Sequence, residues 1–196
     1  MESKARSTDK VNATIERFSG FSEGAVGGGV FIFEAYDKDG NLKWRDKAKN
    51  LTTNTGRQSM NTEFFTGSSY TADWFIGLVN NSPSPTYDVT DTMASHAGWS
   101  ETQAYDGPDR PGAGFGAATS ANPSVIANTT GTGGTVATFT IDDTVTIDGA
   151  FLTDDEAKNT SSGILFSVAA FEAPGDRSVV AGDTLNVTYQ FSLADA

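Results

Sequence analysis

The sequence Thr184-Leu-Asn-Val-Thr-Tyr-Gln-Phe-Ser-Leu193 decides the fold class, because apolar and polar residues alternate along all of it. The apolar positions are Leu185, Val187, Tyr189, Phe191 and Leu193. A period of two places these side chains on one face of a β-strand and the polar side chains on the other. The pattern predicts a half-buried strand of an antiparallel sheet, and Gly182-Asp183 predicts the turn that precedes it.

More strands are predicted on the N-terminal side of this segment. Apolar stretches bounded by turn residues indicate strands at 30–36, 42–45, 74–79, 135–141, 144–152 and 164–171. The first two form a hairpin across the turn Asp37-Lys-Asp-Gly-Asn41. One short helix is predicted over 54–65, with Asn54 as its N-cap, Met60 and Phe64 on one face, and Gly67 at its end. The chain is therefore expected to be all-β: an antiparallel β-sandwich of jelly-roll or immunoglobulin-like type, with one short helix and an extended N-terminal arm.

Two regions are expected along the chain. Residues 1–29 form an N-terminal arm with a glycine-rich hinge, since the run Gly27-Gly-Gly29 resists regular structure. Residues 30–196 form the β-sandwich domain. Within it, residues 86–117 show little periodicity and contain Pro108 and Pro111, which predicts a long surface loop with one short strand near 100–105.

The N-terminal arm carries a short apolar stripe. Val11, Ile15 and Phe18 recur at the spacing of one helix face. A single short stripe does not hold a helix in water unless it docks against another surface. We therefore expect the arm to contact a partner, through Val11, Ile15, Arg17, Phe18 and Phe21.

Charge is divided unevenly between the two parts of the chain. Residues 1–57 hold 10 of the 13 Lys and Arg and 8 of the 25 Asp and Glu, a net charge of +2, whereas residues 58–196 carry −14. The acidic part would repel a phosphate backbone, so no nucleic-acid partner is expected. No apolar run reaches the length of a membrane span and the N-terminus does not resemble a secretory signal, so no membrane partner is expected either.

The candidates for catalysis are weak, and we expect no enzymatic activity, cofactor or metal site. Cysteine is absent, which excludes disulfides and thiolate chemistry. The single histidine, His96, follows Ser95 directly, and adjacent residues do not have the geometry of a nucleophilic triad. Clustered carboxylates can hydrolyse glycosides or bind calcium, but Asp is also common in turns. The clusters that raise these alternatives are Asp142-Asp143, Asp148 and Asp154-Asp-Glu156.

The segment Asp91-Thr-Met-Ala-Ser-His-Ala-Gly-Trp-Ser-Glu101 is distinctive in composition but has no catalytic logic. We expect it to fasten the long loop onto the sandwich, and we call this arrangement the loop clasp. Asp91 and His96 would hydrogen-bond the loop, Met93 and Trp99 would pin it to the core, and Gly98 would allow a sharp bend. The alternative is that Trp99 is a platform for sugar. Trp44 and Trp74 are expected in the core.

Four segments carry a resemblance to a known group of proteins. They are Trp74-Phe-Ile-Gly-Leu78, the clasp segment 91–101, Gly149-Ala-Phe-Leu-Thr153, and Arg177-Ser-Val-Val-Ala-Gly-Asp-Thr-Leu-Asn-Val-Thr-Tyr189. In this order they resemble virion structural proteins of tailed bacteriophages that are encoded with the head genes. The resemblance spans the chain from about Leu42 to the C-terminus and does not include the arm.

The resemblance implies a capsid decoration (cement) protein on the outer surface of the phage head, with the major capsid protein as its partner. A homotrimer is also expected, because compact β-sandwich bodies commonly pack around three-fold axes. A neck, tail or fibre-anchoring protein of the virion is the alternative that fits the same features. A carbohydrate-binding sandwich or glycosidase-like enzyme is a more remote alternative.

Overall fold

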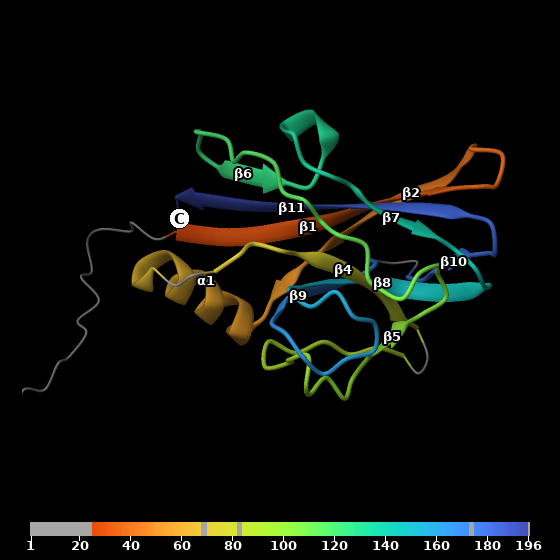
Figure 1. The fold of residues 1–196 in the computed structure, drawn as a ribbon, viewed down its shortest axis with the longest axis horizontal. Coiled ribbons are helices and arrows are strands. Elements are labelled where there is room, and N and C mark those ends of the chain that lie inside the picture. Colours follow the sequence, from red (N-terminus) through yellow and green to blue (C-terminus); the bar gives the residue numbers. More distant parts are fainter. Residues whose placement is uncertain (1–24, 68–69, 82–83, 173–174, 196) are drawn as a thin grey trace, which may run out of the picture.

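The chain folds as two antiparallel β-sheets that pack face to face, with one α-helix at an end of the sandwich (Figure 1). The structure is a computed structural model, and it describes residues 25–67, 70–81, 84–172 and 175–195. The prediction of an all-β sandwich with one helix is confirmed. The expected contacts of the arm at Val11, Ile15, Arg17, Phe18 and Phe21 lie outside the described residues.

The first sheet is built around the segment that decided the fold class. Its strands are β1 (Ala25–Tyr36), β2 (Leu42–Lys49), β6 (Ser124–Ala127), β7 (Ala137–Thr140) and β11 (Thr184–Asp195). The order is β2-β1-β11-β6, and β7 pairs with β11 further along that strand. Pairing between β1 and β11 is continuous from Ala25 with Asp195 to Tyr36 with Thr184, so the first and last described strands lie side by side.

The second sheet has six strands. They are β3 (Leu51–Thr52), β4 (Phe75–Asn80), β5 (Ser100–Thr102), β8 (Val145–Thr153), β9 (Leu165–Ala170) and β10 (Arg177–Val179). The order is β3-β9-β8-β4-β5, with β10 paired to the start of β8. A short 3-10 helix, η1 (Thr130–Thr132), lies between β6 and β7. The predicted hairpin and the predicted strands of both sheets are confirmed, with small shifts at their ends.

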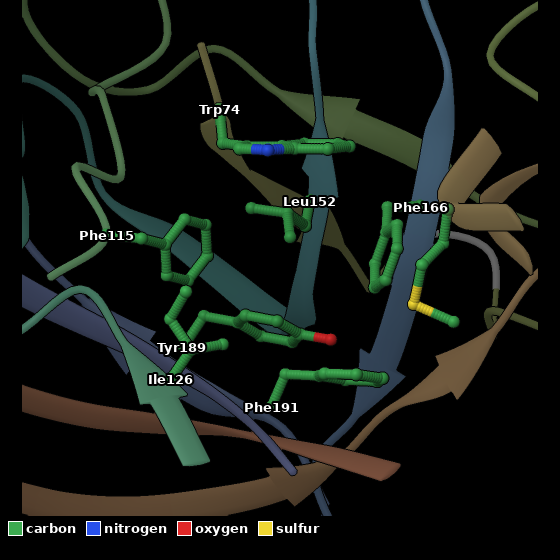
Figure 2. A pocket seen from close by; sticks show the side chains of 8 residues that line it. Trp74, Phe115, Ile126, Leu152, Phe166, Tyr189 and Phe191 are labelled. Atoms are coloured by element: carbon green, nitrogen blue, oxygen red, sulfur yellow. The ribbon is translucent and has the colours of Figure 1, made fainter. Parts of the chain in front are cut away.

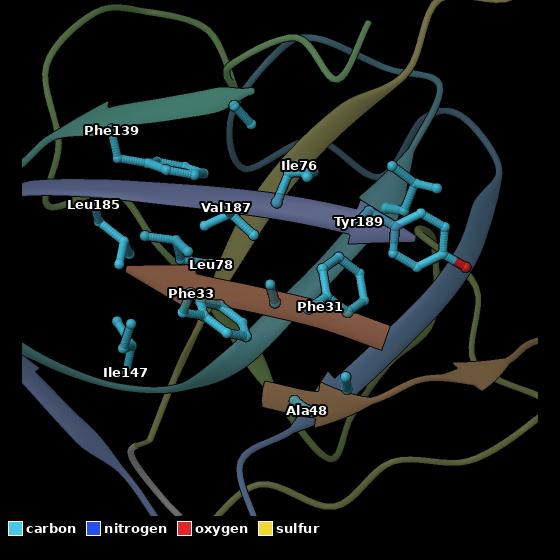
Figure 3. Packing of buried hydrophobic residues seen from close by; sticks show 14 of the residues in the cluster. Phe31, Phe33, Ala48, Ile76, Leu78, Phe139, Ile147, Leu185, Val187 and Tyr189 are labelled. Atoms are coloured by element: carbon cyan, nitrogen blue, oxygen red, sulfur yellow. The ribbon is translucent and has the colours of Figure 1, made fainter. Parts of the chain in front are cut away.

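Alternation along β11 produces the core as expected. Leu185, Val187, Tyr189 and Phe191 are buried, while the polar residues between them are more exposed. Phe31 and Phe33 of β1 meet them from the neighbouring strand (Figure 3). The alternation continues beyond the buried core, since Leu193 lies at the end of the sandwich and is 40% exposed.

The glycine run Gly27–Gly29 is part of β1, so the predicted hinge is wrong at these residues. Gly27 and Gly29 lie on the inner face of the sheet, in line with Phe31 and Phe33. A Cβ on Gly27 would lie 3.1 Å from the Phe191 ring, and one on Gly29 would lie 2.7 Å from the Tyr189 hydroxyl oxygen. Glycine is needed here because large side chains of β11 pass directly over the strand.

Replacing Gly29 with alanine should lower the free energy of unfolding by about 1–3 kcal/mol, through overpacking. The new methyl group would also lie 2.9 Å from the Gln190 carbonyl oxygen, which cannot move without disturbing the sheet. Gly28 is the matched control, because a Cβ there would meet nothing within 4 Å. Urea denaturation should therefore separate the two alanine variants, and equal losses would contradict this account of the glycine run.

The helix α1 (Asn54–Thr66) is confirmed, but its N-cap is Thr53 rather than Asn54. The Thr53 hydroxyl accepts a hydrogen bond from the Gly56 backbone N–H at 3.0 Å. Gly67 ends the helix with a φ of 63°, as predicted. Met60 packs against the core, whereas Phe64 is 80% exposed, so the expected shared apolar face covers the core only at Met60.

The region 86–117 packs more closely than the predicted surface loop. Tyr105, Arg110 and Ala113 are each about 2% exposed, and isolated β-bridges tie this region to the rest of the sandwich. The predicted short strand is present as β5, next to β4. This stretch lacks periodicity because it covers one edge of the core with single side chains, without forming a long strand of its own.

Candidate functional site

The loop clasp is assembled around the indole of Trp99. The Trp99 Nε1–H donates to Asp91 Oδ2 at 3.0 Å. The His96 ring stacks on the indole with ring centroids 3.9 Å apart, and its Nδ1 donates to the Trp99 carbonyl oxygen at 3.1 Å. Met93 and Trp99 are 3% and 6% exposed and join a small buried cluster that includes Phe151. The structure thus brings together Asp91, Met93, His96 and Trp99.

Gly98 lies at the predicted bend, but glycine is required there for a different reason. The predicted bend is present, since Gly98 lies in a turn closed by the hydrogen bond from the Trp99 backbone N–H to the His96 carbonyl oxygen at 3.2 Å. The φ of Gly98 is not in the left-handed region, so the turn itself does not require glycine. A Cβ at Gly98 would instead lie 2.2 Å from the Thr86 carbonyl oxygen. The Thr86 backbone N–H also donates to the Gly98 carbonyl oxygen at 2.8 Å. Glycine is needed because two backbone segments pass in contact at this point.

A buried ion pair lies beside the clasp, and its cation was not singled out from the sequence. The Arg110 side chain is fully buried, and its Nε and Nη2 donate to Glu101 Oε1 and Oε2 at 2.8 and 2.9 Å. Its Nη1 donates to the Asp155 carbonyl oxygen at 2.7 Å. Glu101 also accepts from the Asn159 backbone N–H at 2.7 Å. The pair therefore joins β5, the following loop and the loop after β8.

Several carboxylates of the acidic clusters have structural partners. Asp154 Oδ1 accepts from the Ile164 backbone N–H at 2.6 Å and Asp155 Oδ1 from the Ala157 N–H at 2.9 Å, as expected for turn residues. Asp148 lies within β8, in the strand predicted over 144–152, and accepts a hydrogen bond from the Tyr87 hydroxyl. Burial raises the pKa of Asp148. Across the described residues, no group of three or more His, Cys, Asp or Glu is arranged to hold a metal ion.

Two buried tyrosines should make the fold sensitive to alkaline pH. Burial raises the pKa of Tyr105 and of Tyr189 above the usual value of 10.0. The folded state therefore holds these protons more tightly than the unfolded state, and the stabilisation is complete below pH 10. Above that pH, the free energy of unfolding should fall by up to about 1.4 kcal/mol per pH unit for each tyrosine.

Urea denaturation at a series of alkaline pH values measures this slope. A Tyr189→Phe variant should be less stable near neutral pH, because it loses the hydrogen bond from Asn50. Its stability should nevertheless fall less steeply at high pH. A slope identical to that of the parent would remove Tyr189 from the explanation.

The described cations are concentrated at one sheet edge. We call Lys43, Arg45, Lys47 and Lys49 of the edge strand β2 the basic edge. Lys43 pairs with Asp183 and Arg45 with Glu34, while Lys47 and Lys49 are exposed and form no ion pair with the described residues. The three cations after residue 57 are engaged internally: Arg110 with Glu101, Lys158 with the Tyr105 carbonyl oxygen, and Arg177 with Asp46.

An apolar pocket opens at the α1 end of the sandwich. Trp74, Phe115, Phe166, Tyr189 and Phe191 surround a volume of about 240 Å³ (Figure 2). Met60, Ile126 and Leu152 complete the lining. Trp74, which was expected in the core, lies just before β4 and packs against the core while remaining only partly buried. Trp44 is also only partly buried, against Phe171 at 6.0 Å between ring centroids.

Comparison of the chain with protein-family models, with curated proteins and with solved structures found no match. Where the structure describes the chain, it contains no helix long and apolar enough to cross a membrane.

Proposed function

We propose that this chain is a bacteriophage virion structural protein, a capsid decoration protein that binds the outer surface of the major capsid protein and stabilises the head. The observation that carries the proposal is the charge distribution of the folded body. The chain has a net charge of −12, yet the basic edge of β2 is available to meet a partner while later cations are used internally. Lysines on an edge strand also prevent edge-to-edge aggregation, and a measurement of capsid binding distinguishes this role from docking.

The clasp segment supports a structural role more than a chemical one. It carries the resemblance to phage virion proteins, and its polar side chains Asp91 and His96 form hydrogen bonds within the loop. His96 lies against an indole and a carbonyl oxygen, with no nucleophile bonded to it among the described residues. Trp99 is enclosed by His96 and Phe151 and offers no open ring face on which sugar could stack.

The proposal assigns two contacts to the assembly. The basic edge faces an acidic region of the capsid surface, where opposite charge would steer association and set orientation. The N-terminal arm, through Val11, Ile15, Arg17, Phe18 and Phe21, contacts the capsid or a sister subunit of a homotrimer. Neither contact requires an enzymatic activity, a cofactor, nucleic acid or a membrane.

Charge reversal at the basic edge tests the proposal. The double variant Lys47→Glu/Lys49→Glu should bind undecorated capsids at least about tenfold more weakly than the parent, with a reduced dependence on salt. Lys38→Glu is the control, because Lys38 is exposed in the β1–β2 turn and pairs with Asp39. Equal binding by the parent and the double variant would exclude the basic edge as the docking surface.

Deleting residues 1–24 tests the arm separately. The truncated chain keeps all of β1, so we expect a folded body that no longer occupies purified capsids. Circular dichroism checks the fold, and sedimentation with capsids measures occupancy. Unchanged occupancy would show that the arm is not required for capsid binding.

A further inference from the structure

The α1 end of the sandwich exposes more apolar surface than a solitary body needs. The pocket below Trp74 adjoins a second hollow of about 320 Å³, and Met60, Trp74 and Phe166 line both. Phe64 and Phe65 beside them are 80% and 78% exposed. Isolated exposed apolar residues are ordinary, but a contiguous aromatic patch around an open pocket marks a binding site.

Most of the exposed large hydrophobic residues gather at this same end. The described ones are Val26, Leu42, Phe64, Phe65, Tyr70, Val180 and Leu193. Leu193 lies two residues beyond Phe191, which lines the pocket, and Val26 pairs with the adjacent Ala194. Only Leu42 and Val180 lie elsewhere, so the apolar surface is concentrated at the end where the chain enters the sandwich.

A carboxylate at the rim lacks a partner. Glu63 lines the second hollow, and its Oε2 is buried without a hydrogen-bond partner among the described residues. A buried carboxylate oxygen without a donor costs free energy, and a cation or N–H group would offset that cost. The occupant of this surface should therefore combine apolar side chains with a positive charge.

The N-terminal segment has this combination of groups. The spacing of Val11, Ile15 and Phe18 predicts that they share one helix face, and Arg17 is adjacent to Phe18. Phe18 lies seven residues before Ala25, so the intervening chain spans up to roughly 25 Å when extended. The segment also joins the body beside the pocket, since Gly27 lies against Phe191, which lines it.

We propose that the aromatic pocket binds the N-terminal segment of a second copy of this chain, with Phe18 in the pocket and Arg17 at Glu63. This inference rests on the self-association in the proposed function. The direction of β1 favours a second copy: the strand runs inward from Ala25, so a chain entering its own pocket would have to reverse within a few residues. A segment that continues outward can reach a neighbouring body, and repeating that contact closes a ring.

Crosslinking between differently sized chains tests the inference, because the chain contains no cysteine. A Ser19→Cys variant is mixed with a longer, tagged Ser59→Cys variant; Ser59 lines the hollow, and Ser19 neighbours Phe18. We expect a mixed disulfide in clear excess over the control that uses Ser178→Cys, an exposed position on β10. A yield equal to the control would overturn the inference.

A doubly substituted chain separates the two possible sources of the segment. When Ser19→Cys and Ser59→Cys are in one chain, we expect crosslinking to depend on protein concentration. A disulfide within single chains at high dilution would mean that the segment fills its own pocket, and would overturn the assignment to a second copy. Neither experiment contains capsids, so a failure of capsid binding would leave their results unchanged.

Charge exchange supplies a readout that does not depend on disulfide geometry. Arg17→Glu should weaken self-association several-fold in analytical ultracentrifugation, and Glu63→Arg combined with it should restore association. If the double variant associates no better than Arg17→Glu alone, Arg17 does not pair with Glu63 and the proposed docking is wrong.

Discussion

Replacing Glu101 with alanine should lower the free energy of unfolding by about 3–5 kcal/mol, because it leaves the Arg110 guanidinium buried without its counter-charge. Two hydrogen bonds to the guanidinium are lost, and so is the bond that Glu101 accepts from the Asn159 backbone. The total stability of such a domain is about 5–15 kcal/mol. A loss of this size should therefore lower the melting temperature sharply.

The exposed pair of Arg45 with Glu34 is the matched control. Its nitrogen–oxygen distance is 3.2 Å, but the Arg45 side chain is 58% exposed, so Glu34→Ala should cost less than about 1 kcal/mol. The double variant Glu101→Leu/Arg110→Met should recover much of the loss, since it removes both buried charges together. Urea denaturation measures all three, and equal small losses would contradict a structural role for the buried pair.

Replacing Trp99 with alanine should also cost about 3–5 kcal/mol, in line with other large-to-small changes in cores. The substitution removes the contact with Phe151, the stack with His96 and the hydrogen bond to Asp91. Hydrogen exchange should quicken in the surrounding loop, because the side chain that holds it to the second sheet is missing. No enzymatic activity is expected to change.

Trp99→Phe separates packing from hydrogen bonding. Phenylalanine keeps most of the apolar contact and loses the donor to Asp91, so we expect a smaller loss of stability than with alanine, even with Asp91 left short of one partner. If Trp99→Ala unfolds at the same urea concentration as the parent, the indole does not fasten the loop and the clasp account is wrong.

The strands and much of the clasp were predictable because their signals are local. Alternation along β11 fixes which side chains face inward whatever strand lies beside it. Asp91, His96 and Trp99 are close in sequence, so a single loop can bring them together. Short strands such as β3 and β10 carry too few residues for a period of two to be visible, and they form only because a longer strand offers free backbone groups.

The remaining features depend on contacts between segments far apart in sequence. In the sequence, Arg110 cannot be distinguished from a surface arginine, because its burial depends on β5 and on the loop after β8. The sequence around Gly29 indicates a hinge, because it does not show that Tyr189, far along the chain, packs over this glycine. The apolar pocket is likewise invisible in sequence, since Met60, Phe115 and Phe191 come from separate elements. The one sequence signal of a buried loop ion is a charged residue among turn residues, as in Pro108-Asp-Arg-Pro-Gly112.

A cryo-EM map of the intact virion tests the proposed function most directly. We expect density for this chain over the outer surface of the head, in a copy number comparable with that of the major capsid protein, with the basic edge of β2 against the capsid. Density confined to the neck or tail would contradict a decoration role. Density on the head with β2 facing solvent would contradict the proposed docking surface.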